Sequence, residues 1–297
     1  MTTVDILIPH YNDIVGLKLS IESINTQTWK GKFRIVVCDD GSEKENLAEV
    51  QKLALTDNRI VLKVNEENKG RPYTRNVLLD LIESKYVTWL DAGDEWYADK
   101  ISQQFKAYYR SQFKYEEDHI WVTCNYDWQW IGKKRSIRYQ NIKGDQVKSL
   151  MIGAELRSYL WTLFGTADAF RSVGKFDESL PRLQDLDYFI RFSAKGGRII
   201  NSFEDKPLCV YHKSDIGRDA KEIRSCYYHI YHKHAHLYNK YSTTFRKNRK
   251  FEIERHTARF AASNNDLLLK YQYVLKSFLI DPIGFVFRIV KMRGIKL

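Results

Sequence analysis

The stretch Tyr86-Val87-Thr88-Trp89-Leu90-Asp91-Ala92-Gly93-Asp94-Glu95 decides the fold class of this chain. Its apolar first half is typical of a buried β-strand, and carboxylates begin where that strand ends. In open α/β sheets, ligands bind outside the carboxyl ends of the strands. Asp91 and Asp94 at such an end suit a hard divalent cation, which in turn suits a substrate phosphate. A loop of solvated acids would explain the same residues, so the rest of the chain must decide between the two.

Strand and helix patterns alternate on both sides of this stretch. Before it, strands are expected at 4–8, 33–38 and 60–64, and helices at 14–26, 47–55 and 73–82. After it, we expect a helix at 99–110, a strand at 120–131 returning as a hairpin at 136–140, a strand at 161–164, a helix at 184–192, strands at 199–203 and 208–211, and then helices. This alternation predicts an α/β fold with a mostly parallel sheet and helices on both faces.

The net charge of +11 is confined to the last part of the 297 residues. Residues 212–297 hold 18 Lys/Arg and 7 Asp/Glu, whereas the 30 basic and 30 acidic residues of 1–211 cancel. We therefore expect a catalytic domain at 1–215 and a basic helical region at 216–297. A uniformly basic nucleic-acid binder is a poor description of this pattern, and no nucleic-acid partner is expected.

The cysteines and the first residues indicate the compartment. Four cysteines are widely scattered without a CxxC pair, which favours reduced thiols in the cytosol over a disulfide framework or a zinc site. No basic and apolar signal segment precedes the first expected strand, so secretion is not expected. His232 and His236 would share one helix face but lack the HExxH pattern, and a solvated face explains them better than zinc does.

Polar residues follow four of the expected strands, and their side chains could converge on one rim of the sheet. Asp39 or Asp40 could accept hydrogen bonds from a base or a ribose. The planar guanidinium of Arg75 suits a phosphate or a base. Each of these residues alone is better explained as a helix cap or a turn residue, but four such strand ends in order are harder to dismiss.

Over about residues 3–215, the order and spacing of these motifs resemble the family 2 inverting glycosyltransferases of the bacterial surface-polysaccharide type. The motifs are ILIPHYN at 6–12, VVCDDGS at 36–42, NKG with RN at 68–76, and LDAGD at 90–94. The resemblance implies the GT-A fold, a nucleoside-diphosphate sugar donor (a UDP-sugar first), Mn²⁺ or Mg²⁺, and inversion at the anomeric carbon. It also implies that residues 1–97 bind the nucleotide sugar and residues 98–215 form the acceptor side.

The same resemblance implies roles for single residues. Pro9, Tyr11, Asp39 and Arg75 match nucleoside-site positions, with Asp40 as their neighbour.

The metal motif departs from the usual form of the family, which commonly has an acid where this chain has Gly93. Asp94 is therefore expected to be the principal metal ligand, while Asp91 braces the loop or contacts the ribose. A late histidine can lie near the metal in related GT-A enzymes, which makes His212 a second candidate ligand for a Mn²⁺-like ion. A polar histidine at a strand end is the simpler alternative.

The segment 182–191 is similar to the acceptor-side segment of the family, where an acidic pair at a helix N-terminus supplies the catalytic base. Gln184 replaces the first acid, so Asp185 is expected to take the proton of the acceptor hydroxyl, with Asp187 close in sequence. A helix start with acids favoured by the helix dipole is the alternative. One of Trp128, Trp130 and Trp161 is expected to stack on a sugar ring.

The apolar run 281–293 is too short to span a bilayer and is interrupted by Arg288. Its mixture of cationic and apolar residues suits an anionic membrane surface, and a helix docked on the catalytic domain is the alternative. We expect a cytoplasmic enzyme, peripheral at the inner face of the cell membrane, that acts on a glycan or lipid-linked acceptor. Two other interpretations are an inactive nucleotide-sugar-binding protein, supported by Gly93 and Gln184, and a basic nucleic-acid or membrane-surface binding module.

Overall fold

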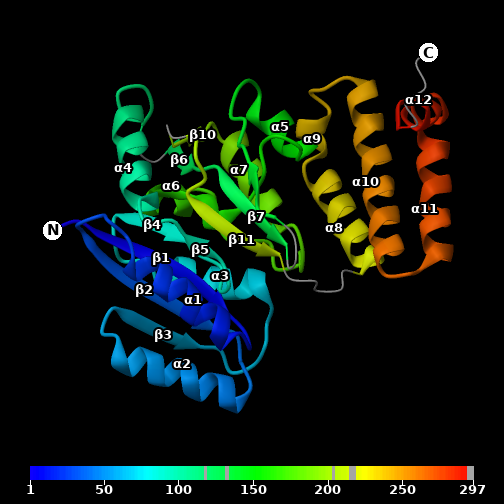
Figure 1. Cartoon of the computed structure of the whole chain (residues 1–297). Helices are drawn as coiled ribbons and strands as arrows, with labels where there is room; N and C mark the ends of the chain where they lie inside the picture. Colours follow the sequence, from blue (N-terminus) through cyan, green and yellow to red (C-terminus); the bar gives the residue numbers. More distant parts are fainter. Residues whose placement is uncertain (117–118, 131–133, 203–204, 214–218, 293–297) are drawn as a thin grey trace. The chain divides into compact units, whose positions relative to one another are not determined.

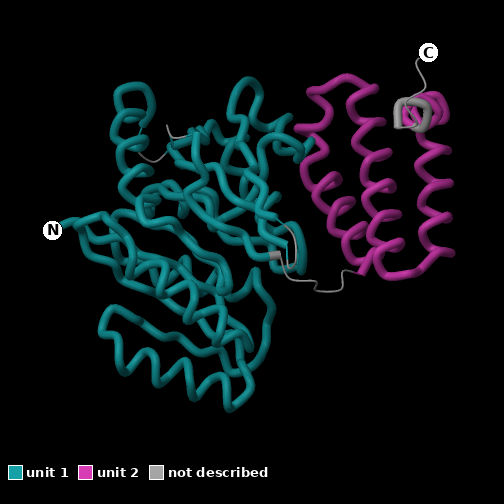
Figure 2. Tube along the Cα trace, viewed as in Figure 1, with its two compact units in different colours: residues 1–214 teal, residues 215–297 magenta. Residues whose placement is uncertain are grey.

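The computed structural model describes residues 1–116, 119–130, 134–202, 205–213 and 219–292. The chain falls into two compact units, residues 1–214 and residues 215–297 (Figure 2). Among the described residues, no helix combines the length and the apolar character needed to cross a membrane.

A seven-stranded sheet with the order β10-β6-β9-β4-β1-β2-β3 forms the centre of the first unit (Figure 1). Its strands are β1 Thr3–His10, β2 Lys32–Asp39, β3 Ile60–Val64, β4 Tyr86–Trp89, β6 Ile120–Thr123, β9 Phe164–Thr166 and β10 Arg198–Asn201. β1 pairs in parallel with β2 on one side and with β4 on the other, and only β9 runs antiparallel to its neighbours in this described sheet. The carboxyl ends of β1 and β4 therefore form the topological switch point at which α/β sheets bind ligands.

Helices cover both faces of this sheet because successive side chains of a strand point to opposite sides. The helices are α1 Ile14–Asn25, α2 Lys44–Thr56, α3 Arg71–Asp80, α4 Lys100–Ser111, α5 Gln146–Ile152, α6 Ala167–Arg171 and α7 Gln184–Ala194. Val4, Ile6 and Ile8 of β1 share one core with Leu17 of α1 and with apolar residues of α2 and α4. The intervening Leu7 is buried on the opposite side, where α3 packs against β1 and β2. The predicted α/β class is confirmed.

A second sheet holds the loop that follows β4. It contains β5 Glu95–Trp96, β11 Cys209–Lys213, β7 Tyr126–Trp130 and β8 Ser136–Arg138, in that order. β11 runs antiparallel to β5, with Val210 opposite Glu95, and parallel to β7. The loop from Asp91 to Asp94 therefore joins a strand of the first sheet to a strand of the second.

Two predicted strands are wrong in detail. The single strand expected at 120–131 is two strands, β6 and β7, which belong to different sheets. The chain changes sheet at Asn125, whose side-chain oxygen accepts the backbone N–H of Gln140 at 2.9 Å. The strand expected at 161–164 begins instead as the 3-10 turn Leu160–Thr162, because the Thr162 hydroxyl donates back to the carbonyl of Tyr159 at 2.7 Å. Residue 131 of the predicted strand at 120–131, residues 132–133 of the predicted hairpin turn and residue 203 of the predicted strand at 199–203 lie outside the described residues.

The second unit contains helices in its described part. They are α8 Ala220–Lys233, α9 Ala235–Tyr238, α10 Thr243–Ser263, α11 Leu267–Ile280 and α12 Pro282–Met292. Arg224 of α8 pairs with the buried Glu254 of α10 through hydrogen bonds of 2.7–3.1 Å. α10 therefore contacts α8 on one hand and α11, which packs along it, on the other.

All four cysteines are free and buried. Cys38 lies in β2, Cys124 between β6 and β7, Cys209 at the start of β11, and Cys226 in α8. The fold brings the sulfur atoms of Cys124 and Cys209 to 3.4 Å from each other, although the two residues are 85 positions apart.

Candidate functional site

The ends of β1 and β2 are joined by a buried histidine and a buried aspartate. His10 Nδ1 lies 2.7 Å from Asp39 Oδ2, and His10 Nε2 accepts the backbone N–H of Asp13 at 3.2 Å. Because Nε2 accepts, Nδ1 carries the hydrogen and donates a hydrogen bond to Asp39. Ser42 completes the cluster by donating its hydroxyl and its backbone N–H to Asp39, at 2.6 and 2.9 Å.

These bonds set the charge of Asp39. Burial raises the pKa of its carboxyl group, but the hydrogen bonds from His10 and Ser42 outweigh burial and hold the pKa below its usual value. The carboxylate is therefore ionised at neutral pH, and its acceptor positions are used by the protein itself. In this structure Asp39 fixes the shape of the strand ends.

Asp40 holds the next loop in the same way. Its carboxylate accepts the backbone N–H groups of Lys69 and Gly70, at 3.1 and 2.9 Å, and the side-chain amide of Asn65 at 2.9 Å. Gly70 is the N-cap that directly precedes the first residue of α3, Arg71. Asp40 therefore sets the start of the helix that carries Arg75.

Tyr11 differs from these aspartates because its side chain is open to solvent. It directly follows β1, in which Pro9 pairs with Cys38, and it is 48% exposed. Of the residues predicted for the nucleoside site, Tyr11 is the one most accessible to a ligand, whereas Asp39, Asp40 and Arg75 are buried.

Gly41, between Asp40 and Ser42, is required because the backbone of Glu67 approaches it closely. Its φ is +71°, and an added Cβ would lie 2.5 Å from the carbonyl carbon of Glu67. We expect Gly41→Ala to lower the free energy of unfolding by about 2–4 kcal/mol, through backbone strain and through the clash. Urea unfolding would measure this change.

Gly144→Ala is the matched control for Gly41→Ala. Gly144 has φ +75° but an added Cβ would meet nothing within 4 Å, so only the strain of about 1 kcal/mol is expected. Equal losses in the two variants would contradict the role assigned to the Glu67 contact.

Arg75 joins two carboxylates that are far apart in the sequence. Its Nη2 lies 3.1 Å from Asp91 Oδ1 and 3.2 Å from Oδ2, while its Nη1 donates to Asp185. The guanidinium is 1% exposed and also lies over the ring of Phe176. The end of β4 and the start of α7 therefore meet at one buried cation.

Asp185 lies in the first turn of α7, at the meeting point with Arg75. The chain enters this helix through Leu183, whose φ of 61° is a left-handed conformation that leucine rarely adopts. Burial raises the pKa of Asp185, Arg75 lowers it, and Asp91 raises it again, so that the pKa lies above its usual value. A carboxylate with a raised pKa is suited to proton transfer near neutral pH.

Asp187 does not share this environment. It is fully buried and pairs with Nε of Arg191, one turn further along α7, at 2.9 Å. Asp187, which lies close to Asp185 in the sequence, therefore stabilises α7 through its ion pair with Arg191.

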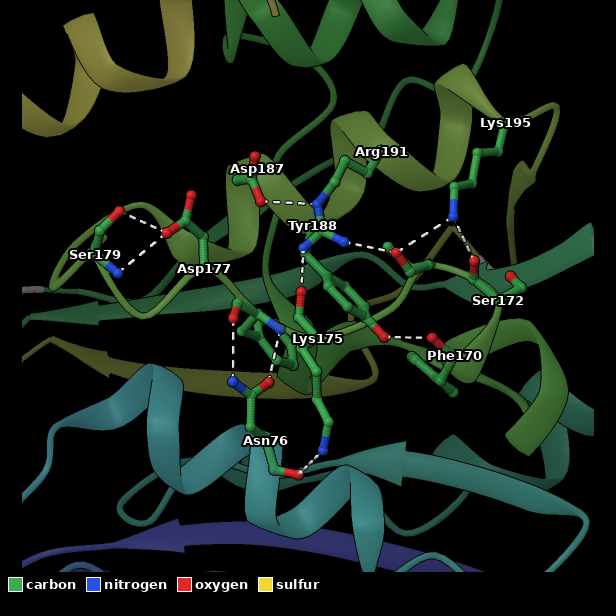
Figure 3. A network of polar contacts seen from close by, with 12 residues as sticks. Asn76, Phe170, Ser172, Lys175, Asp177, Ser179, Asp187, Tyr188, Arg191 and Lys195 are labelled. Carbon is green, nitrogen blue, oxygen red and sulfur yellow. Dashed lines mark hydrogen bonds and ion pairs between the residues drawn. The ribbon is translucent and has the colours of Figure 1, made fainter. Parts of the chain in front are cut away.

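Figure 3 shows the polar network that fixes the segment before α7. Asn76, the neighbour of Arg75, accepts the backbone N–H of Phe176 at 2.6 Å and donates to its carbonyl at 3.1 Å. Arg191 of α7 donates to the carbonyls of Val173 and Lys175 at 2.6 and 2.8 Å. The segment is thus bound to both α3 and α7, which orients Arg75 and Asp185 toward each other.

Asp94 is a buried carboxylate with acidic neighbours. The backbone N–H of His212 donates to Asp94 Oδ1 at 3.1 Å, and the Ser20 hydroxyl donates to the Asp94 carbonyl at 2.8 Å. Burial and the nearby charge of Asp91 raise the pKa of Asp94 well above its usual value. A cation at this position would offset that cost.

The loop is closed by Gly93, whose φ is +95° and whose N–H donates to the Ser20 hydroxyl at 3.1 Å. A residue with a side chain would be strained in this conformation, which favours glycine at this position.

Asp94 fits a divalent metal better than His212 does. The imidazole of His212 is hydrogen-bonded through Nε2 to Glu95, so its ring already has a protein partner. In the part of the chain that the structure describes, no three His, Cys, Asp or Glu side chains are arranged to hold a metal ion by themselves. A metal on Asp94 would therefore need further oxygen ligands from a bound substrate.

Several residues of this site were missed by reasoning from the sequence. They are His10, Ser20, Ser42, Arg71 and Glu95. Arg71 is exposed at the first position of α3, and its charge lowers the pKa of both Asp94 and Asp185. Its spacing of four residues from Arg75, on the same helix face, was the signal that could have indicated it.

Trp161 is excluded as a sugar-stacking residue because it is 2% exposed and packs in one aromatic cluster with Tyr159 and Tyr211. Trp128 and Trp130 are partly exposed.

Comparison with known proteins gives a family match and relatives. The model of the family described as glycosyl transferase family 2 matches residues 5–154. An uncharacterized glycosyltransferase of Methanocaldococcus jannaschii is 28% identical over 221 residues, which cover 71% of this chain and 72% of that protein. The Escherichia coli UDP-Glc:alpha-D-GlcNAc-diphosphoundecaprenol beta-1,3-glucosyltransferase WfgD is 35% identical over 101 residues, 34% of this chain and 39% of that protein.

Solved structures share the fold. The mannosyltransferase PcManGT of Pyrobaculum calidifontis, determined in complex with GDP-Man and Mn²⁺, superposes with a TM-score of 0.59 at 14% identity. The superposition covers 98% of this chain and 79% of that one. At this identity the likeness shows the fold alone, which is GT-A with a C-terminal helical extension.

Proposed function

Because the chain belongs to glycosyl transferase family 2, as an enzyme of the polysaccharide-biosynthesis type, we propose that it transfers a sugar from a nucleoside-diphosphate sugar to an acceptor hydroxyl with inversion. The donor is a UDP-sugar, and the acceptor is a glycan or a lipid-linked sugar. The name of WfgD, with its UDP-Glc donor and diphosphoundecaprenol acceptor, supports this choice. Residues 1–97 bind the donor and residues 98–215 form the acceptor side.

One observation carries the proposal: Arg75 pairs with both Asp91 and Asp185. The loop proposed to face the donor and the residue proposed as the base thus share one buried cation. In the reaction, the acceptor oxygen bonds to the anomeric carbon as the bond from that carbon to the diphosphate oxygen breaks. Asp185 takes the proton of the acceptor hydroxyl, and the leaving nucleoside diphosphate keeps the electron pair.

The other residues have supporting roles. Tyr11 and Pro9 contact the nucleoside directly, while Asp39 and Asp40 position the loops around it. Arg71 contacts the diphosphate, which its exposed position at the start of α3 supports.

Asp94 would hold Mn²⁺ or Mg²⁺, with His212 as a second ligand if its ring leaves Glu95. When bound, the cation supplies positive charge that stabilises the departing diphosphate. The complex of PcManGT with GDP-Man and Mn²⁺ supports a cation in a related fold.

The enzyme acts in the cytoplasm, peripherally at the inner face of the cell membrane. A lipid-linked acceptor would be located there, and the surplus of basic residues in 212–297 supports attraction to an anionic surface.

The test is release of nucleoside diphosphate from a panel of UDP- and GDP-sugars with Mn²⁺ or Mg²⁺, followed by NMR of the anomeric proton of any product. Metal-dependent release from one donor and an inverted product are expected. Absence of binding to every donor, with or without metal, would overturn the proposal.

A second candidate, an inactive nucleotide-sugar-binding protein, is favoured by Gly93 and Gln184, which stand where the family has acids. Donor binding without turnover across a panel of acceptors would decide for it.

Asp94→Asn is expected to inactivate the enzyme and also to stabilise it. The raised pKa means that ionised Asp94 lowers stability as the pH rises through that pKa, so a neutral amide removes the cost at pH 7. Each kcal/mol gained raises Tm by roughly 2–4 °C for a unit of this size. Differential scanning fluorimetry at pH 5 and pH 8 would measure the change, which should be larger at pH 8.

The surface variant Glu49→Gln is the control, because Glu49 is exposed and pairs only with Lys18 among the described contacts. A lower Tm for Asp94→Asn at both pH values would contradict the expectation.

A further inference from the structure

The exposed face of α11 is apolar, which is the reverse of an ordinary surface helix. Its inner face buries Tyr273 and Ser277. Its outer face exposes Leu268, Tyr271, Leu275 and Leu279, with Leu268 87% and Leu279 68% exposed. These residues follow the helical spacing of three and four, so they form one continuous stripe.

The first turns of α12 add further exposed apolar side chains. Ile283 and Phe287 are exposed, while the opposite side of the helix is attached to α10. There, Arg288 pairs with Glu252 at 2.6 Å and lies over the ring of Phe251, and Phe285 also packs on Phe251. The apolar side of α12 is therefore held outward by contacts within the second unit. Six of the exposed apolar residues of the two helices are named the outer face of α11 and α12: Leu268, Tyr271, Leu275, Leu279, Ile283 and Phe287.

The charges around the outer face are mainly positive, and the two acids that cap α11 are already bonded, Asp266 to the backbone N–H of Leu269 and Asp281 to Lys247. Lys270 and Lys276 are the charged residues of α11, which contains no acid. Residues 215–297 as a whole hold 17 Lys/Arg and 7 Asp/Glu. Two copies of this face in contact would bring like charges together, whereas an anionic lipid surface would accept both the leucines and the lysines.

We propose that the outer face of α11 and α12 is the surface through which the chain binds an anionic phospholipid bilayer. α11 has 14 residues, fewer than the about 20 needed to span a bilayer, so it lies in the interface plane with its leucines in the lipid. Lys270, whose Nζ lies 5.0 Å from the ring centroid of the outer-face Tyr271, reaches toward the headgroups. The predicted membrane contact at 281–293 is thereby moved mainly to α11. The proposal stands on the second unit and does not depend on the reaction assigned to the first.

The test is flotation of the full chain with phosphatidylcholine vesicles, with and without phosphatidylglycerol. Wild type is expected to bind the mixed vesicles and to bind pure phosphatidylcholine more weakly. Leu268→Ser/Leu279→Ser should weaken binding about tenfold or more, because two exposed leucines no longer enter the lipid. Lys270→Gln/Lys276→Gln should reduce both the binding and its sensitivity to salt.

The matched control is Leu55→Ser/Phe113→Ser, which removes two apolar side chains that are 87% and 95% exposed in the first unit. It should bind vesicles as wild type does, and circular dichroism should show that both double variants are folded. Unchanged binding by Leu268→Ser/Leu279→Ser would overturn the proposal. The proposal would also be overturned if sedimentation velocity shows that wild type is a dimer and the variant a monomer, and neither protein binds vesicles.

Discussion

Replacing Arg75 with methionine is expected to abolish sugar transfer and to lower the free energy of unfolding of the first unit by about 3–5 kcal/mol. Methionine fills much of the same volume but leaves Asp91 and Asp185 facing each other without a cation. Both carboxylates depend on a guanidinium that is almost fully buried. Urea unfolding, with tryptophan fluorescence as the probe, would measure the loss.

Arg75→Lys separates charge from geometry. Lysine keeps the positive charge but lacks the planar fork that reaches two carboxylates at once, so an intermediate loss is expected. The double variant Arg75→Met/Asp185→Asn should lose less stability than the sum of the single changes, because the pair is removed together. Wild-type stability in Arg75→Met would show that the buried pairs contribute nothing.

Asp185→Asn is expected to reduce the transfer rate by about 10²–10⁴-fold while leaving the affinity for the nucleoside diphosphate unchanged. Asparagine has the same shape as aspartate but cannot take the acceptor proton. The rate of nucleoside-diphosphate release with acceptor and calorimetric binding of UDP would measure the two effects separately.

The dependence of the transfer rate on pH is a second test of Asp185→Asn. Asp185 acts as a base only when ionised, and its raised pKa places the acidic limb of the wild-type rate above the usual range of an aspartate. The rate should rise with pH through this limb, and the limb should disappear in Asp185→Asn. Asp168→Asn is the control, since Asp168 is an exposed acid in the first turn of α6. If Asp185→Asn keeps both the rate and the limb, another residue is the base.

Much of the donor half of the fold could be predicted from local patterns. Val4, Ile6 and Ile8 alternate with other apolar residues along β1, and each expected strand up to Trp89 ends in the polar motif that the sequence shows. The carboxyl ends of parallel strands lie at the same edge of a sheet. The strand pattern was therefore enough to predict that Asp39, Asp40 and Asp91 lie at one edge.

Contacts between distant segments could not be predicted in this way. Arg75 and Asp185 are 110 residues apart, and nothing in either local sequence indicates that the two side chains pair. The contact of Asp94 with His212 depends on the antiparallel pairing of β5 and β11, a strand pair that joins residues more than a hundred positions apart.

The break in the strand expected at 120–131 had a different cause. The apolar alternation continues through Cys124 and Asn125, so periodicity alone gives one strand. The chain leaves the first sheet there because Asn125 bonds Gln140 and Asn201, a tertiary preference that overrides the local pattern.

The distribution of buried thiols allows the two units to be followed independently. Cys38, Cys124 and Cys209 belong to the first unit and Cys226 to the second, and none is accessible in the folded chain. A thiol reagent can therefore reach each cysteine only when the surrounding structure opens. Mass spectrometry of the labelled peptides would yield a separate opening rate for each unit from a single, unmodified protein, and would reveal whether they unfold as one cooperative system or as two.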